Sequence, residues 1–371
     1  MLLLTPGPVS THPSVRAAAA QDFAPWDNDF RPLNASVRER VLAIAGVSGA
    51  THATLPLQGC GHFAIEAAVR TFVPEGSRIL IPATGQYADR AARLAREAGV
   101  AVVPLPVAPD TRVDPAALAA ALDDDPAISH ALLIYSETSS GIVHDVPALA
   151  AAAGRSGRRV VVDAVSAFGA LPLDLAALPM VDAMVFTANK CIEGLPGLAF
   201  AVCPIERLAA CQGRARSWSL DLASIYQNAL AYGFGSFRFT PPAQILAAFS
   251  VALDLFDAEG GRPVRLQRYT ATMRVLYDGV AALGLHPCLP LALQGPIVVN
   301  VHAPDDPAWD LQAFVDAMKR RGFLISNFHN TPGPSFRVGC MGAITPADMA
   351  RAVVAMGEAM DEMGLRTRRA A

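Results

Sequence analysis

Short apolar runs alternate with longer alanine-rich stretches between about residues 55 and 205, a pattern typical of strands separated by helices. The runs predicted as strands are 78–81, 100–103, 131–134, 160–162, 183–186 and 198–201. The stretches predicted as helices between them are 87–98, 115–122 and 146–153. Because these strands are apolar on both faces, they favour a mostly parallel sheet covered by helices on both sides.

The pattern changes after Pro241-Pro242. Two long helices are predicted there, at about 243–258 and 264–283, followed by a strand at 297–301. The remaining predicted elements are a helix at about 308–320, strands near 323–325 and 336–338, and a last helix at about 346–363. We therefore expect an N-terminal segment (1–16), a large α/β domain (17–258) and a smaller C-terminal α+β domain (259–371).

Composition narrows the function classes. The 371 residues are 52% hydrophobic, which supports a large core, and 30 basic residues face 33 acidic ones. Without a basic excess, a general nucleic-acid binder is excluded. No stretch approaches the ~20 unbroken apolar residues of a membrane span, and the N-terminus lacks the pattern of a signal peptide. The six cysteines are scattered, so we expect no metal site and a reducing, cytoplasmic setting.

Lysine is the rarest source of positive charge in this chain. Of the 30 basic residues only Lys190 and Lys319 are lysines. Lys190 follows the predicted strand 183–186, and a lysine amine can lose its proton and form a Schiff base, which arginine cannot do. Lys319 lies in a basic helix end, where its charge complements the helix dipole. We favour Lys190 as the chemical group over the alternative of a surface lysine.

Three further loops follow predicted strands, where open parallel sheets bind ligands. Asp163 ends a buried strand and needs a cationic or hydrogen-bonding partner, such as a protonated ring nitrogen. Segment 58–63 puts glycines before a helix, which suits a phosphate but also suits a plain turn. Segment 135–141 carries hydroxyls that suit either a ligand or a helix cap. An amine, a carboxylate and an anion site together match the needs of pyridoxal 5′-phosphate (PLP).

The chain resembles the class V, fold-type I PLP-dependent aminotransferases, whose large domain holds a mostly parallel seven-stranded sheet. The motifs that carry the resemblance are 5–8, 59–66, 136–138, 163–166, 188–190 and 336–339. Segments 25–29, 187–197 and 216–222 are most similar to members that move the amino group of 2-aminoethylphosphonate to pyruvate, a step of phosphonate catabolism giving phosphonoacetaldehyde and alanine. The likeness runs from the N-terminus to the final helix.

The resemblance implies roles for matching residues. Lys190 would bind PLP covalently and shuttle a proton, and Asp163 would pair with the pyridine nitrogen. The other implied cofactor contacts are Cys60, Gly61 and His62 at the phosphate, Tyr87 and Val165 on the two ring faces, and Thr138 and Thr187. Arg238 and Thr240 would reach the phosphate of the neighbouring subunit, which implies a homodimer. Arg337 would clamp the carboxylate or phosphonate of each substrate, and the other implied substrate contacts are Thr5, Gly7 and Trp26.

Two segments beside Arg337 depart from the pattern of the family. Segment 326–331 reads Ser-Asn-Phe-His-Asn-Thr where Tyr-Pro-Gly-Lys is expected, and 339–342 reads Gly-Cys-Met-Gly in place of Gly-Asn-Ile-Gly. A related aminophosphonate or another small amine is therefore an alternative substrate. The sequence also leaves open an alanine–glyoxylate or serine–glyoxylate type aminotransferase, a PLP lyase or desulfurase on the same fold, and a dinucleotide-binding protein without PLP.

Overall fold

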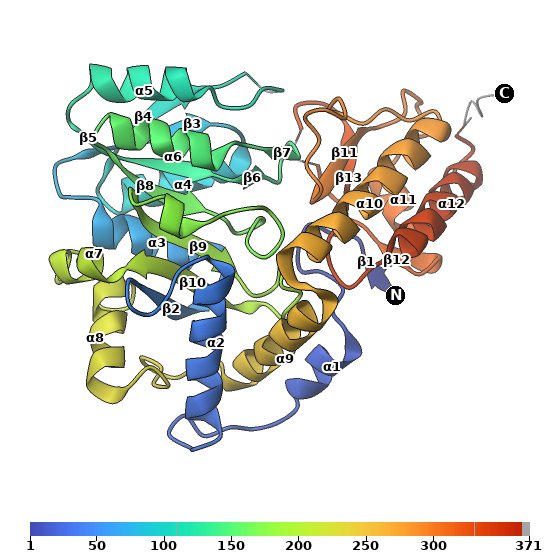
Figure 1. Cartoon of the computed structure of the whole chain (residues 1–371). Coiled ribbons are helices and arrows are strands. Elements are labelled where there is room, and N and C mark those ends of the chain that lie inside the picture. Colours follow the sequence, from blue (N-terminus) through green and yellow to red (C-terminus); the bar gives the residue numbers. More distant parts are fainter. Residues whose placement is uncertain (109, 330, 366–371) are drawn as a thin grey trace.

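A seven-stranded sheet forms the centre of the larger part of the molecule, as the computed structural model shows (Figure 1). The structure describes residues 1–108, 110–329 and 331–365. The strands, in sheet order, are β2 (His52–Gly59), β10 (Gly197–Pro204), β9 (Val181–Thr187), β8 (Arg159–Asp163), β5 (Ile128–Ile134), β3 (Arg78–Ala83) and β4 (Ala101–Pro106). The neighbours from β9 to β4 pair in parallel, and β10 is antiparallel to both of its neighbours. The prediction of a mostly parallel α/β sheet is confirmed.

Helices cover both faces of this sheet with two separate apolar cores. One core is contributed by α2 (Phe30–Ile44), α5 (Pro115–Asp124), α6 (Val146–Arg155) and α9 (Ala243–Glu259). The other is contributed by α3 (Gly61–Phe72), α4 (Gln86–Glu97), α7 (Ile205–Ala210) and α8 (Leu222–Tyr232). Burial of both strand faces explains why the strands read as continuous apolar runs.

The direction of the strands brings distant loops to one edge of the sheet. Because β2 and β9 are both antiparallel to β10, β2 runs in the same direction as the parallel strands. The carboxyl ends at this edge are Gly59, Ala83, Ile134, Asp163 and Thr187. The segments that the sequence analysis selected for chemistry follow these residues, so the fold places them at the edge where parallel sheets bind ligands.

The smaller part of the molecule is reached through α10 (Gly261–Ala282), which runs from the sheet domain into the C-terminal elements (Figure 1). Its strands β11 (Val298–His302) and β13 (Ser335–Gly339) form an antiparallel pair. Helices α11 (Leu311–Arg320) and α12 (Pro346–Glu362) share one apolar core with these strands. Strand β1 (Leu2–Leu3) pairs in parallel with β12 (Phe323–Leu324), so the N-terminus joins the C-terminal part. The domain boundaries at 16 and 258 stay predictions.

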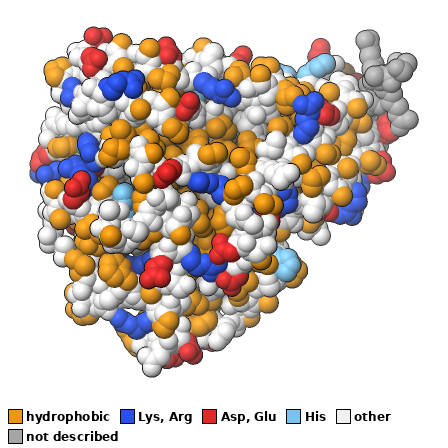
Figure 2. Space-filling view, in the orientation of Figure 1, with side chains coloured by type: hydrophobic (Ala, Val, Ile, Leu, Met, Phe, Trp, Pro, Cys, Tyr) orange, Lys and Arg blue, Asp and Glu red, His pale blue; other side chains and the backbone are white. Residues whose placement is uncertain are grey.

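The remaining elements are short: α1 (Pro13–Ala18), β6 (Ser136–Glu137), β7 (Ile142–Val143) and the 3-10 turn Leu175–Ala177. The sequence analysis did not predict α2, α8 and β2. Figure 2 shows basic and acidic side chains interspersed over one face of the molecule, without a continuous basic area. Among the described residues, no helix combines the length and the hydropathy needed to span a membrane.

Candidate active site

Lys190 lies in the turn that follows β9, beneath the N-terminal segment. Its Nζ donates a hydrogen bond of 2.5 Å to the carbonyl oxygen of Pro6. A Cβ added to Gly7 would lie 2.4 Å from the same Nζ, and Gly7 has φ +126°, so the close cover over the lysine requires glycine. Desolvation lowers the pKa of Lys190 to about 8, and the charges of Arg337 and Arg90 act in the same direction. A neutral amine is therefore accessible near physiological pH.

Asp163 ends the buried strand β8, and its side chain is 5% exposed. One carboxylate oxygen accepts a hydrogen bond of 2.9 Å from the Val165 amide. Desolvation raises the pKa of Asp163 to about 7. Lys190 acts on this carboxyl group only as a smaller, opposing charge, so the site offers a buried carboxyl group that a protonated ring nitrogen would pair with and keep ionised.

The start of α3 forms a compact cradle at the end of β2. A Cβ on Gly61 would lie 2.7 Å from Val165 Cγ2 and 3.6 Å from Thr187 Cγ2, which shows that these three residues are adjacent. Cys60 precedes the helix without a side-chain cap, and its Sγ lies 3.4 Å from His62 Nδ1. The helix dipole and the first amide groups favour an anion there.

Tyr87 and Thr138 approach the same edge from β3 and β5. Thr138 Oγ1 lies 3.1 Å from Ser166 Oγ, three residues beyond Asp163. The Tyr87 amide donates to the buried carboxylate of Glu137 over 3.4 Å, and the Ser139 amide donates to the same oxygen over 3.0 Å. Glu137 thus ties the start of α4 to the loop after β5 and fixes the position of Tyr87.

Arg90 is a cation of this site that the sequence analysis missed. Its guanidinium carbon lies 4.9 Å from the centre of the Tyr87 ring, one helical turn away on α4. Its charge lowers the pKa of His62 after the larger effect of burial, and it also acts on Lys190 and Arg337. The signal in the sequence was the spacing from Tyr87, since residues i and i+3 share a helix face.

Arg337 lies in β13 and is 3% exposed. Desolvation lowers the pKa of Arg337. Together with Thr5 and Gly7 it lines a cavity of about 420 Å³, so the structure brings three of the four predicted substrate residues together. Trp26 does not line this cavity and is 81% exposed. Lys319 lines the cavity as well, which the sequence analysis did not anticipate.

The two departing segments occupy different surroundings. Ser326, Asn327 and Phe328 line the Arg337 cavity, and the Phe328 ring centre lies 4.2 Å from the Arg337 guanidinium carbon. Asn330 of the same segment is outside the described residues. Cys340 and Met341 are fully buried, and Met341 packs in a cluster with Cys191. The first departure therefore changes a wall of the cavity, and the second changes buried packing, which for Met341 includes Cys191 of the turn beside Lys190.

Arg238 and Thr240 line a second cavity, of about 340 Å³. Its walls include Gln58 and Phe63 of segment 58–63 but none of Lys190, Asp163, His62 and Arg337. Arg238 lies 4.6 Å from the Phe239 ring centre, and its Nη1 is buried without a hydrogen-bond partner among the described residues.

The arrangement of these groups fits PLP. The buried Asp163 carboxylate suits the ring nitrogen, and the buried Thr187 hydroxyl has no hydrogen-bond partner in the described structure. Lys190 supplies an amine with a lowered pKa for the aldehyde. The cradle at Gly61 and His62 suits the phosphate.

Comparison with known proteins also indicates an aminotransferase. The sequence profile of the aminotransferase class-V family matches residues 28–305. A 2-aminoethylphosphonate–pyruvate transaminase of Burkholderia ambifaria (strain MC40-6) is 42% identical over 368 residues, covering 99% of this chain and 98% of the relative. Another, of Pseudomonas entomophila (strain L48), is 40% identical and covers 98% of this chain and 97% of the relative.

Solved structures of aminotransferases share the fold. The pyridoxamine–pyruvate aminotransferase of Mesorhizobium loti superposes with a TM-score of 0.88 at 25% identity, covering 99% of this chain and 94% of that chain. The alanine–glyoxylate aminotransferase of Nostoc sp. reaches 0.87 at 22% identity, covering 97% and 95%. The predicted fold class is thereby confirmed.

Proposed function

The chain belongs to the class-V aminotransferase family, and from that premise we propose that it transfers the amino group of 2-aminoethylphosphonate to pyruvate. The products are phosphonoacetaldehyde and alanine, and PLP is the cofactor. The choice of substrate rests on one observation. Relatives named 2-aminoethylphosphonate–pyruvate transaminase are 38–42% identical to the chain over almost its whole length. The geometry of the site is consistent with that chemistry.

PLP, when bound, supplies an aldehyde that takes up the amine and a ring that withdraws electrons from the reacting carbon. Asp163 would hold the ring nitrogen in its protonated form. His62, Gly61 and the start of α3 would hold the phosphate, and Tyr87 and Val165 would pack against the ring. Lys190 Nζ takes a proton from the carbon that bears nitrogen in the donor, and it returns a proton at the carbon of the acceptor.

Arg337 binds the acidic group of each substrate in turn. A guanidinium offers a planar pair of donors that suits both a carboxylate and a phosphonate. A phosphonate carries up to two negative charges where a carboxylate carries one, and Arg90 supplies a second positive charge beside Tyr87. The two arginines together favour an aminophosphonate as donor, while Arg337 alone suffices for pyruvate.

Single-turnover reactions with individual amines test this function. The PLP form is mixed with 2-aminoethylphosphonate, alanine, serine or ethylamine, and the visible absorption of the bound cofactor is followed. We expect the visible absorption to decrease fastest with 2-aminoethylphosphonate, because it alone presents a phosphonate to Arg337 and Arg90. Conversion by alanine without conversion by 2-aminoethylphosphonate would show that the phosphonate assignment is wrong and would favour an aminotransferase of the alanine–glyoxylate type.

We also propose a homodimer in which Arg238 and Thr240 serve the cofactor phosphate of the partner subunit. The support is the surface around Arg238. Trp218 is 78% exposed, Phe239 is 50% exposed, and their rings meet edge to face at 5.0 Å. Phe239 has φ +68°, a strained conformation for a residue with a side chain. An exposed aromatic pair beside a half-buried guanidinium, whose Nη1 has no hydrogen-bond partner among the described residues, suits a protein interface. The substrate role of Trp26 and the cytoplasmic location stay predictions.

Subunit complementation tests the shared site. Arg238→Met is expected to weaken PLP binding by about 10–100-fold, because it removes charged hydrogen bonds to the phosphate. A mixed dimer of one Lys190→Ala chain and one Arg238→Met chain should then regain about half of the activity of the wild-type dimer, since one of its two sites has both native residues. The two chains are co-expressed with different tags, purified through both tags and assayed. The assay uses a PLP concentration that loads wild type but leaves Arg238→Met largely empty, and if Arg238 acts within its own chain, the mixed dimer will then be no more active than its parents.

A further inference from the structure

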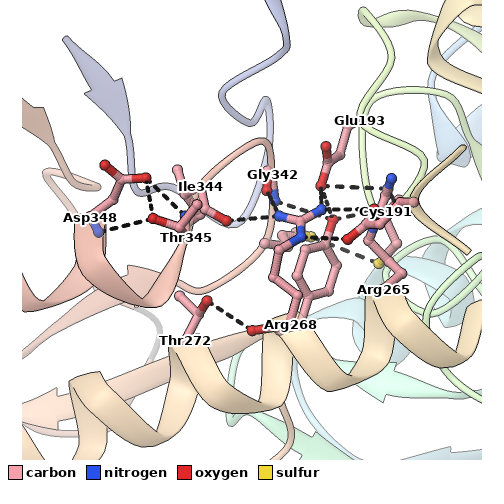
Figure 3. Close-up of polar contacts among 12 residues, drawn as sticks. Cys191, Glu193, Arg265, Arg268, Thr272, Gly342, Ile344, Thr345 and Asp348 are labelled. Atoms are coloured by element: carbon pink, nitrogen blue, oxygen red, sulfur yellow. Dashed lines mark hydrogen bonds and ion pairs between the residues drawn. The ribbon is translucent and has the colours of Figure 1, made fainter. Parts of the chain in front are cut away.

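Three side chains of α10 converge on the loop that follows Lys190 (Figure 3). Arg265 Nη1 donates to the carbonyl oxygen of Cys191 at 2.5 Å. Arg268 Nη2 and the Tyr269 hydroxyl both donate to Glu193 Oε1, each at 2.7 Å. Glu193 itself has φ +63°, which a side chain rarely adopts, and its amide donates to the Lys190 carbonyl oxygen at 2.8 Å. The loop that carries the lysine is therefore held in a strained form by α10.

The same Arg268 also holds the loop that follows the Arg337 strand. Its Nη1 donates to the carbonyl oxygens of Gly342 at 2.7 Å and Ile344 at 2.8 Å. Its Nε donates to Glu259 Oε1 at 2.6 Å, and Nη2 reaches Glu259 Oε2 at 3.3 Å. A guanidinium has five N–H groups, and the acceptors on Glu193, Glu259, Gly342 and Ile344 use all five. Arg268 therefore has no donor left for a substrate.

The loop beyond β13 in turn fixes the cover over Lys190. The Gly339 amide donates to the Leu4 carbonyl oxygen, and the Ala343 amide donates to the Ser10 carbonyl oxygen, both at 2.8 Å. Between these two points the chain passes Pro6, whose carbonyl oxygen accepts from Lys190 Nζ. The contacts thus form a closed ring: lysine loop, α10, loop 339–344, N-terminal segment and lysine.

We propose that Arg268 is a positioning residue that sets where the Arg337 clamp stands relative to Lys190. It is the one guanidinium of Figure 3 that joins the lysine loop directly to the loop after the Arg337 strand. The inference rests on the proposed function, in which Arg337 holds the acidic group while Lys190 moves the proton. A substrate bridged between the two residues reacts only when their separation matches its length.

The charges of the cluster explain why arginine is needed at position 268. Arg265 and Arg268 face Glu193 and Glu259, and these four side chains are all at most 20% exposed. A methionine at 268 would leave a carboxylate excess in a desolvated place. A lysine at 268 would keep the charge, but its single ammonium cannot reach both loops in the fixed fork of a guanidinium. The two variants therefore separate loss of charge from loss of the bridge.

The test compares 2-aminoethylphosphonate with ethylamine, which is the same amine without the phosphonate. For each enzyme the ratio of the two second-order rate constants with the PLP form is measured. We expect Arg268→Lys and Arg268→Met each to lower this ratio by about 10–100-fold. Misplacement of a binding group by about 1 Å can lower a reaction rate by up to about 100-fold. Ethylamine does not use Arg337, so its own rate should change little.

Arg274→Met is the matched control on the same helix. Arg274 is 55% exposed and pairs with Asp278 one turn away, so its replacement should leave the ratio unchanged. PLP content and urea unfolding of all variants are measured beside the rates, and Arg268→Lys keeps the test decisive if Arg268→Met does not fold. A ratio within twofold of wild type, or equal losses with both amines, would overturn the positioning role. If the wild-type enzyme does not react with 2-aminoethylphosphonate, the proposed function is wrong. The ratio of the second-order rate constants for alanine and ethylamine then tests the role of Arg268 separately.

Discussion

Lys190→Ala is expected to abolish transamination, with turnover lowered by at least about 10⁴-fold, the upper range for loss of a positioned acid–base group. Lys190 Nζ is the amine that the site places against Pro6 with a pKa lowered to about 8. Wild-type protein loaded with PLP should be yellow, and the variant should lose the lysine-bound absorption. Lys190→Arg should be equally inactive, because it restores the charge without an amine that can lose its proton.

Chemical labelling locates the lysine independently of turnover. Borohydride reduction of the loaded wild type should fix the cofactor to the chain, and mass spectrometry of the digested protein should find it on Lys190. The Lys190→Ala protein should carry no label. Since Lys319 lines the Arg337 cavity, a label on Lys319 would show that the assignment of Lys190 is wrong.

The buried strands of the sheet could be predicted because a strand that is buried on both faces has a continuous run of apolar residues. Strand β2 escaped prediction for a physical reason. It contains Pro56, which lacks an amide donor and argues against a central strand. In the fold β2 is an edge strand, where proline is tolerated. Its position nevertheless matters, because it delivers Gly59 and the start of α3 to the active edge.

Helix α2 was missed because its buried face is partly polar. Asn34 and Arg38 are buried in it, and both reach the Ser236 carbonyl oxygen. These side chains interrupt the apolar period that marks an amphipathic helix. Their partner lies about 200 residues away along the chain, so no local pattern could show that they would be satisfied.

The residues of the candidate site also fall into those that the sequence could predict and those that it could not. Lys190 and Asp163 were predictable because each lies at or just beyond the end of a strand, which fixes its place in a parallel sheet. Arg268 was not, because its partners Glu193 and Gly342 lie 75 residues before it and 74 residues after it. Its value as a bridge depends on how α10 packs between two loops, and that packing is a property of the whole fold.

Asp163→Asn is expected to have opposite effects on activity and on the stability of the cofactor-free protein. Turnover should fall by about 10²–10⁴-fold, because asparagine cannot keep the ring nitrogen protonated. Without PLP, the folded protein binds a proton at Asp163 up to about pH 7, whereas the unfolded chain releases it near 3.8. In that window the folded state holds the extra proton, so the free energy of unfolding falls as the pH rises. The pKa difference corresponds to about 4 kcal/mol lost from wild type by pH 8.

Asparagine resembles the protonated acid and does not titrate, so the variant should lack this loss. Urea unfolding of both cofactor-free proteins at pH 5 and pH 8 measures the difference. His144, whose pKa is lowered to about 4 mainly by desolvation, also titrates near this window, but it is present in both proteins and cancels in the comparison. The variant should match wild type only below about pH 3.8, exceed it by roughly 1.5 kcal/mol at pH 5 and exceed it by about 4 kcal/mol at pH 8. Equal pH dependences would mean that Asp163 is already paired before the cofactor binds, and the carboxylate would then not be the group held ready for the ring nitrogen.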